Sequence, residues 1–222
     1  MYLDHAELAA LAEVLLRHEH VSIASDDIYN RILFSGHEWV NLAMVNPDLQ
    51  DRVFIINGVS KTYCMTGWRI GYLIGSAPVV KAAANIQSQS TSNPTAMAQY
   101  AGVAALTGDQ QVVRDMVKLF EQRCRYVLDR LDRLPGVTCP PPDGAFYVFP
   151  NCSAYYGKKG PAGIINSSLD LSNYLMGEAH LAVVPGSAFG EDNCIRLSYA
   201  LSLDDLEEGF DHLDKALQAL SG

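Results

Sequence analysis

The sequence predicts an α/β fold in its first half, followed by a smaller α+β module. Helix-like and strand-like segments alternate early, with a helical pattern at residues 4–18 and apolar strands at 21–24 and 53–56. After residue 135, short strands and helices follow one another around proline- and glycine-rich turns. Alternation of the first kind is typical of a parallel sheet covered by helices, so we expect such a sheet in the first half.

The composition is that of a globular chain with an acidic balance. The 222 residues are 49% hydrophobic and 18% charged, and the net charge is −9. This balance argues against nucleic acid as a partner. The sequence has no apolar segment near the roughly 18–20 residues that a membrane span needs. The start of the chain lacks a basic leading region, so we do not expect a signal peptide.

The five cysteines and six histidines are scattered along the sequence. The cysteine count is odd, and the sequence contains neither a CxxC pair nor a cysteine–histidine cluster. We therefore expect reduced, mostly buried thiols in a cytoplasmic protein, and we expect no metal site.

The first helix and the two strands that follow carry the earliest structural signals. Asp4 is a candidate N-cap with Glu7 three residues on, and Leu8, Leu11 and Leu15 fall on one helical face. The strand at 21–24 leads into Asp26 and Tyr29, and the strand at 53–56 leads toward Lys61. The three side chains thus fall just past strand ends, where ligands collect in open α/β sheets.

Further along the chain, one expected helix is long. Its expected apolar face consists of Val112, Met116, Phe120, Val127 and Leu131. We place a domain boundary within this helix, giving domains at 1–110 and 111–222. The remaining expected segments are a strand at 71–75, helices at 76–87, 95–106 and 109–134, a loop at 88–94, strands at 137–139 and 145–149, a loop at 155–163, a helix at 170–180, strands at 181–184 and 194–198, and a helix at 203–220.

Lys61 is an unusual residue for the end of a buried strand. An ammonium group loses water there, and burial favours its neutral, nucleophilic form, which suits the formation of an imine with an aldehyde. The alternative is that Lys61 reaches the surface and that Arg69, eight residues later, pairs with a carboxylate.

Four other residues favour the interpretation of Lys61 as an imine-forming lysine. Asp26 could keep a pyridine nitrogen protonated, and Tyr29 could donate a hydrogen bond to a phenolate oxygen. Arg69 could bind a phosphate, and Arg196 could bind a carboxylate through two parallel hydrogen bonds. Together with Lys61, these groups are what pyridoxal phosphate chemistry requires from a protein.

The sequence resembles the carboxyl-terminal part of a fold-type I, class I/II aminotransferase, and in particular the bacterial aspartate aminotransferases. SDDIY at 25–29 resembles the aspartate and tyrosine motif, and NGVSKTYCMTGWRIGY at 57–72 resembles the cofactor-lysine motif. QSQSTSNPTAMAQ resembles a loop near the dimer interface of that family. DGAFYVFP, VVPGSAFG and IRLSYA resemble three motifs of its small domain.

The resemblance implies a role for each candidate residue. Lys61 would be the imine lysine, Asp26 the partner of the ring nitrogen and Tyr29 that of the phenolic oxygen. Arg69 would bind the cofactor phosphate, with Ser60 as a weaker candidate for the same group, and Arg196 would bind the substrate carboxylate. Alternatives remain open from the residues themselves: Asp27 could replace Asp26, Tyr29 could be a core aromatic, and Arg196 could form a structural ion pair.

The resemblance also implies a long amino-terminal half ahead of residue 1. In the family that half supplies sheet strands, a phosphate-binding turn, an aromatic residue on the cofactor ring and an asparagine near its phenolic oxygen. We locate none of these in the sequence. We therefore expect a truncated chain that binds the cofactor weakly or not at all, with an exposed sheet edge that favours association, most simply as a homodimer.

The implied activity is transfer of an amino group between an amino acid, with aspartate favoured, and a 2-oxo acid through a pyridoxal phosphate imine. Two alternatives stay open. One is a β-lyase on the same scaffold, because such reactions diverge only after the shared imine. The other is a non-catalytic fragment that acts as an association module.

Overall fold

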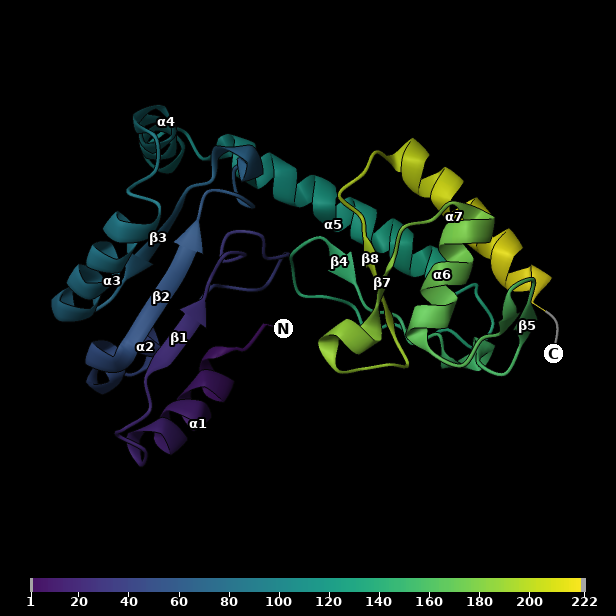
Figure 1. Ribbon diagram of the computed structural model, residues 1–222, viewed down its shortest axis with the longest axis horizontal. Helices are drawn as coiled ribbons and strands as arrows, with labels where there is room; N and C mark the ends of the chain where they lie inside the picture. The colour runs from purple at the N-terminus through teal and green to yellow at the C-terminus, as the bar shows by residue number, and fades with distance from the viewer. Residues whose placement is uncertain (1, 221–222) are drawn as a thin grey trace. The chain divides into compact units, whose positions relative to one another are not determined.

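The computed structural model describes residues 2–220 and divides the chain into two compact units (Figure 1). The first unit is Met1–Val117 and the second is Lys118–Gly222. The division falls inside the helix α5, Gln111–Leu131.

The first unit contains a three-stranded sheet in the order β1-β2-β3. β1 pairs with β2 in parallel, whereas β2 and β3 are antiparallel. The expectation of a parallel sheet is therefore wrong for β3. The chain between β2 and β3 contains only a short 3-10 turn instead of a crossover helix, so it returns directly beside β2. The strands are β1 (Ile23–Asp26), β2 (Val53–Gly58) and β3 (Gly71–Ile74), and the turn is η2 (Thr66–Trp68).

One face of this sheet is covered by helices. The first helix begins after Asp4, which forms the expected capping box with Glu7. It buries Leu8 and Ala12, whereas Leu11 is 39% exposed, so the predicted apolar face is rotated from the observed one. The core under the sheet consists of Leu8, Ala12, Leu42, Leu49 and Val53. The covering elements are α1 (His5–Leu16), α2 (Leu42–Val45) and η1 (Pro47–Arg52).

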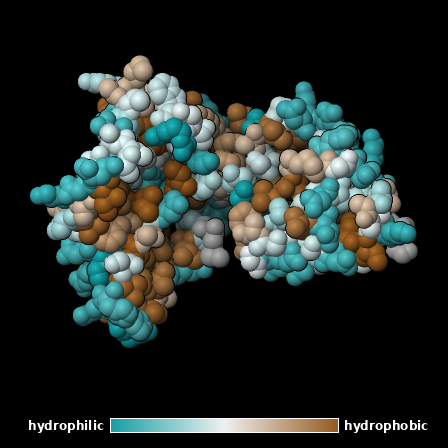
Figure 2. Space-filling model, viewed as in Figure 1, coloured by the Kyte–Doolittle hydropathy of each residue, from teal (hydrophilic) through white to brown (hydrophobic). Residues whose placement is uncertain are grey.

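Two further helices of the first unit bury little of their apolar surface. α3 (Ala77–Ser90) has no buried residue, and α4 (Ala96–Thr107) buries only Ala98 and Gly102. α3 runs three residues beyond its predicted end and takes up part of the segment expected as a loop. Figure 2 shows hydrophobic surface over this unit. The exposed apolar side chains of the unit include Ile56, Ile74, Ile86, Met97, Tyr100 and Val103.

The second unit is built on a three-stranded antiparallel sheet in the order β4-β8-β7. The predicted strand at 137–139 is reduced to one bridge between Thr138 and Asn151. The predicted loop at 155–163 contains most of a short hairpin, β5–β6, because Gly160 and Gly163 allow its tight reversal. The strands are β4 (Tyr147–Val148), β5 (Lys159–Gly160), β6 (Gly163–Ile164), β7 (Val184–Pro185) and β8 (Ile195–Ser198).

Helices pack on the sheet of the second unit and bury its core. Leu171, Leu175, Ile195 and Tyr199 are at most 1% exposed. The side chain of Arg130 on α5 bonds Asp211 and Asp214 on α7 at 2.8 and 2.9 Å, which joins these two helices. The helices are α6 (Ser168–Ala179), α7 (Leu203–Ala219), η3 (Ser153–Tyr155) and η4 (Gly186–Phe189).

The predicted apolar face of α5 is partly correct. Phe120, Val127 and Leu131 are buried as expected. Val112 is 68% exposed, and its neighbour Val113 is buried in its place. At the start of α5 the buried position is therefore Val113 and not the predicted Val112.

The five cysteines are free thiols, and Cys124, Cys152 and Cys194 are buried. Burial raises the pKa of the Cys152 thiol to about 12 and that of Cys139 to about 11. Because the thiolate is the reactive form, burial disfavours the reactive form of these two side chains at neutral pH. Cys64, in contrast, is exposed. No helix within residues 2–220 is long and apolar enough to cross a membrane.

Arg52 holds the end of α1 against the start of the sheet. Its guanidinium donates to the carbonyl oxygens of Leu15, His18 and Val21 at 2.9–3.0 Å. We expect the Arg52→Met variant to lose about 1–3 kcal/mol of unfolding free energy, because three carbonyl groups lose a charged donor. Urea denaturation measures the loss. Arg17→Met removes an exposed arginine from the same helix end and should change stability by less than about 0.5 kcal/mol; equal effects of the two substitutions would contradict the role of Arg52.

Candidate active site

The parallel pairing of β1 and β2 brings two predicted site segments to one edge of the sheet. Asp26, the last residue of β1, lies opposite Ile56 of β2. β2 ends two residues later at Gly58, and Lys61 follows in the next turn. Because parallel strands end at the same edge, Asp26 and the start of the lysine turn share it.

Asp26 and Asp27 lie in different environments, which separates the two alternatives. The Asp27 carboxylate accepts hydrogen bonds from Ser25 Oγ at 2.7 Å and from Asn41 Nδ2 at 3.3 Å. Asn41 is only 2% exposed, so Asp27 satisfies a buried amide. Asp26 is exposed, and its carboxylate accepts from the Ile28 N–H at 3.3 Å. The Asp27 carboxylate is therefore held by two side-chain hydrogen bonds, whereas the Asp26 carboxylate is exposed to solvent.

Lys61 lies in a turn that is closed by backbone hydrogen bonds on both sides. The Met65 N–H donates to the Ser60 carbonyl at 3.1 Å, and the Cys64 N–H donates to the Lys61 carbonyl at 3.3 Å. Lys61 and Ser60 are half-buried, so Lys61 is neither fully buried nor fully exposed. The neighbouring Thr62 is 3% exposed, and its Oγ1 has no hydrogen-bond partner among the described residues.

Tyr29 and Arg69 complete the predicted set in the first unit. Tyr29 is half-buried, and its carbonyl accepts from the Ile32 N–H at 2.8 Å in the turn after β1. Arg69 has a left-handed backbone (φ 54°) just before β3. A non-glycine residue pays of order 1 kcal/mol for this conformation, and such residues concentrate at functional sites. The Arg69 guanidinium is exposed, and it donates to the Thr66 carbonyl at 2.9 Å.

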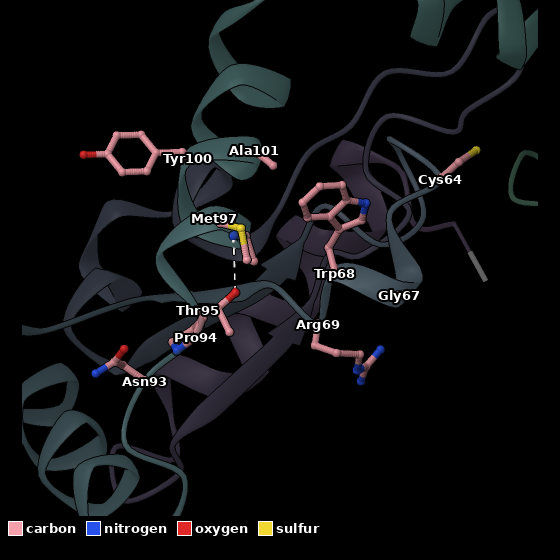
Figure 3. A pocket seen from close by; sticks show the side chains of 11 residues that line it. Cys64, Gly67, Trp68, Arg69, Asn93, Pro94, Thr95, Met97, Tyr100 and Ala101 are labelled. Atoms are coloured by element: carbon pink, nitrogen blue, oxygen red, sulfur yellow. Dashed lines mark hydrogen bonds between the residues drawn. The ribbon is translucent and has the colours of Figure 1, made fainter.

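A groove of about 950 Å³ opens beside Arg69. Figure 3 shows Trp68 and Met97 on its two sides, from η2 and from the start of α4. Thr95 caps α4 there by accepting from the Ala98 N–H at 3.4 Å (Figure 3). The groove is mainly apolar at Trp68, Met97 and Tyr100, so Arg69 is the cation at the border of an apolar surface.

Arg196 belongs to the second unit, whereas the other five predicted residues belong to the first. It lies half-buried on β8, the central strand of its sheet. Its Cζ atom is 4.5 Å from the ring centroid of Tyr147 and 4.5 Å from that of Phe189. Within residues 2–220 its guanidinium has no hydrogen bond and no ion pair. The structural ion pair considered from the sequence is therefore absent from the described part of the chain.

Comparison with known proteins decides the family. The model of the family "Aminotransferase class I and II" matches residues 1–213. This chain belongs to that family. Its elements also superpose on the aspartate aminotransferase from Rhizobium meliloti with a TM-score of 0.94 at 42% identity, covering 99% of this chain and 55% of that one. The aromatic aminotransferase from Pyrococcus horikoshii gives a TM-score of 0.88 at 29% identity and covers 97% and 56% of the two chains.

The sequence relatives of this aminotransferase chain are about twice as long. A probable aspartate/prephenate aminotransferase from Rickettsia bellii is 46% identical over 98% of this chain and 55% of its own length. The aspartate aminotransferase from Geobacillus stearothermophilus is 44% identical over 96% of this chain and 53% of its own length. The chain thus spans about half the length of the relatives it matches, and its fold is that part of a fold-type I aminotransferase.

Sequence reasoning missed the two aromatic residues around Arg196 in this aminotransferase chain. Tyr147 lies in the segment DGAFYVFP and Phe189 in VVPGSAFG, both of which carry the family resemblance. Their spacing from Arg196 in the sequence gives no sign of contact. The register of β4 and β7 on β8, which only the structure provides, brings them together.

The two neighbouring aspartates should respond differently to removal of the carboxylate. We expect Asp27→Ala to lower the free energy of unfolding by about 1–3 kcal/mol, because the buried Asn41 amide loses its acceptor. Asp26→Ala should change it by less than about 0.5 kcal/mol, because its carboxylate is exposed. Thermal and urea unfolding of both variants measure the contrast. The assignment of Asp27 as the structural residue fails if Asp26→Ala is the more destabilising of the two.

Proposed function

We propose that this chain carries the lysine-bearing part of the active site of a pyridoxal-phosphate-dependent aminotransferase. The reaction is transfer of an amino group between an amino acid, with aspartate favoured, and a 2-oxo acid. The observation that carries the proposal is the shared sheet edge, where the exposed Asp26 carboxylate ends β1 and Lys61 follows β2. The names of the relatives as aspartate or aspartate/prephenate aminotransferases support the substrate class.

The residues at this edge fit pyridoxal phosphate in the chemistry of their donors and acceptors. The cofactor has a basic ring nitrogen, a phenolic oxygen, an aldehyde and a phosphate. The edge offers a carboxylate at Asp26, a phenol at Tyr29, an amine at Lys61 and a guanidinium at Arg69, with the Ser60 hydroxyl beside the lysine. The Asp26 carboxylate has the exposure that a ligand contact requires, whereas Asp27 is occupied.

When bound, pyridoxal phosphate supplies an electron-accepting ring conjugated to the reacting carbon. Asp26 would keep the ring nitrogen protonated, because a nearby anion favours the charged form of that nitrogen. Tyr29 would donate to the phenolic oxygen. Arg69 and Ser60 would bind the phosphate, the first with charge-assisted hydrogen bonds.

Lys61 has two tasks in this proposal. Its amine would hold the cofactor by condensing with the aldehyde, with loss of water, and would thereby position it. Once freed by the incoming amino acid, the Lys61 amine would act as the general base for the proton on the α-carbon and then, as its conjugate acid, would return that proton. Arg196 binds the α-carboxylate of the amino acid, for which its guanidinium has unused donors within the described chain.

A second copy of this chain is the partner that the first unit favours. α4 exposes Met97, Tyr100 and Val103 at spacings of three residues, and they are 77%, 79% and 57% exposed. Residues at this spacing share one helical face, and an apolar face of this kind marks an interaction site. The same surface supports the second candidate function, an association module.

The free thiols of the chain suit the reducing cytoplasm, and we place the protein there.

The covalent role of Lys61 can be tested on the purified chain. Because we expect the chain to hold the cofactor weakly, pyridoxal phosphate is added in excess and the adduct is made irreversible by borohydride; peptide mass mapping should then find most of it on Lys61. The Lys61→Arg variant should lose this adduct, whereas Lys81→Arg, which changes an exposed lysine on α3, should retain it. An adduct that is spread evenly over the lysines, or that survives in Lys61→Arg, would contradict the assignment and favour the association module.

The dimer can be tested by changing the exposed face of α4. We expect the chain to sediment as a dimer and Tyr100→Glu to shift it toward the monomer, because a buried carboxylate would replace an apolar contact. Lys81→Glu adds a carboxylate to α3 and should leave the dimer intact. A wild-type monomer, or a Tyr100→Glu variant as dimeric as the wild type, would argue against this surface.

A further inference from the structure

Arg196 is held on the central strand of the second unit, with aromatic side chains arriving from both neighbouring segments. β4 pairs Tyr147 with Ser198, two residues along β8 from Arg196. Residues two apart on a strand share a face, so Tyr147 is a diagonal neighbour of Arg196, within reach of a long side chain. β7 pairs Val184 with Arg196, and the η4 turn that follows β7 ends at Phe189.

The contacts of Arg196 are of one kind. Its guanidinium carbon lies 4.5 Å from each of the two ring centroids. No carboxylate or carbonyl within residues 2–220 accepts a hydrogen bond from it. A guanidinium carries five N–H donors around its edge, and none of those of Arg196 is used in a hydrogen bond within the described residues. The edge is therefore the part of this half-buried cation that remains for a ligand.

Each of the two rings is itself supported by another ring. Tyr147 packs on Phe146 with centroids 4.5 Å apart, and Phe189 packs edge-to-face on Phe149 at 5.9 Å. Such ring pairs have preferred geometries and restrict one another. Each ring beside Arg196 therefore has a second aromatic neighbour within the second unit.

The backbone around Phe189 is also constrained. A Cβ atom on Gly186, at the start of η4, would lie 2.1 Å from the Glu191 carbonyl oxygen and 2.2 Å from that of Cys194. Gly190, directly after Phe189, has a left-handed backbone with φ of 80°. Two glycines that few other residues could replace therefore bracket the turn that presents the Phe189 ring.

We propose that Tyr147 and Phe189 are positioning residues for the substrate carboxylate: their rings hold the plane of the Arg196 guanidinium so that its N–H edge receives the carboxylate in that plane. The identity of the ligand rests on the proposed function. Neither ring needs to touch the substrate for this role. The physical basis is pre-organisation, because a side chain ordered before binding loses less conformational entropy when the ligand arrives.

The role predicts a dependence on the ring and not on the hydroxyl. Tyr147→Leu and Phe189→Leu replace a ring by an aliphatic side chain, whereas Tyr147→Phe and Phe189→Tyr keep the ring and serve as matched controls. Arg196→Lys removes the planar fork, and the signal that it removes assigns the Arg196 Nε–H resonance. All variants are made in the full chain, and the backbone amide spectrum reports whether each remains folded.

The first measurement is nitrogen-15 relaxation of the Arg196 Nε–H group without ligand. We expect an order parameter of about 0.8 in the wild type and in the ring-keeping controls, falling below about 0.6 in the two leucine variants. The second measurement is titration with succinate, a dicarboxylate that has neither an amino nor an oxo group. Each leucine variant should bind succinate roughly fivefold more weakly, in line with the loss of one cation–π contact.

The outcomes separate this inference from the proposed function. Leucine variants with an unchanged Arg196 order parameter would overturn the inference, and so would leucine variants that lose order but bind succinate as tightly as the wild type. A wild type that does not bind succinate, or that binds it equally after Arg196→Lys, would overturn the carboxylate role of Arg196 in the proposed function. The positioning role of the rings would then be decided by the relaxation data alone.

Discussion

The parallel register of β1 on β2 is the constraint on which the proposed site depends. It is extended past the strand by the hydrogen bond from the Asp27 N–H to the Ile56 carbonyl at 2.9 Å. A slip of one residue would turn Asp26 to the covered face and Asp27 to the open one, because side chains alternate along a strand. The bonds of Asp27 to Ser25 and Asn41 oppose that slip. A structural carboxylate thus fixes the orientation of the proposed functional one.

The sequence was most informative where a residue's role follows from its place on a strand end. Asp26 and Lys61 could be placed at one edge because apolar runs and the parallel pattern locate strand ends. The capping box of Asp4 and Glu7 is likewise a local signal, and it is confirmed. In contrast, the antiparallel direction of β3 was not predicted. It depends on the path of residues 59–70, which brings Gly71 opposite Gly58. The contact of Arg196 with Tyr147 depends on pairing between segments 49 residues apart in sequence, and its contact with Phe189 depends on the return of the chain from β7 to β8; single-sequence periodicity encodes neither.

The two units differ in how fully they bury their own apolar side chains. In the second unit Leu171, Leu175 and Ile195 lie at most 1% exposed between helices and sheet. In the first unit, α3 buries no residue, and Ile56 and Ile74 are 46% and 54% exposed on strands. Apolar surface left in water costs roughly 25 cal/mol per Å² relative to burial. The proposed association with a second copy therefore rests on the exposed apolar side chains of the first unit.

Arg69 and Arg196 are both candidates for binding an anion, but their surroundings differ. Arg69 is exposed and bonds the carbonyl of Thr66, so its position is set by a left-handed backbone and one local hydrogen bond. Arg196 is half-buried and stacked, with its edge donors unused in the described chain. A phosphate can be bound by an exposed, hydrated cation such as Arg69, because its charge acts over several ångströms. A planar carboxylate favours a planar fork oriented in advance, and of the two arginines Arg196, placed between two rings, is the better candidate.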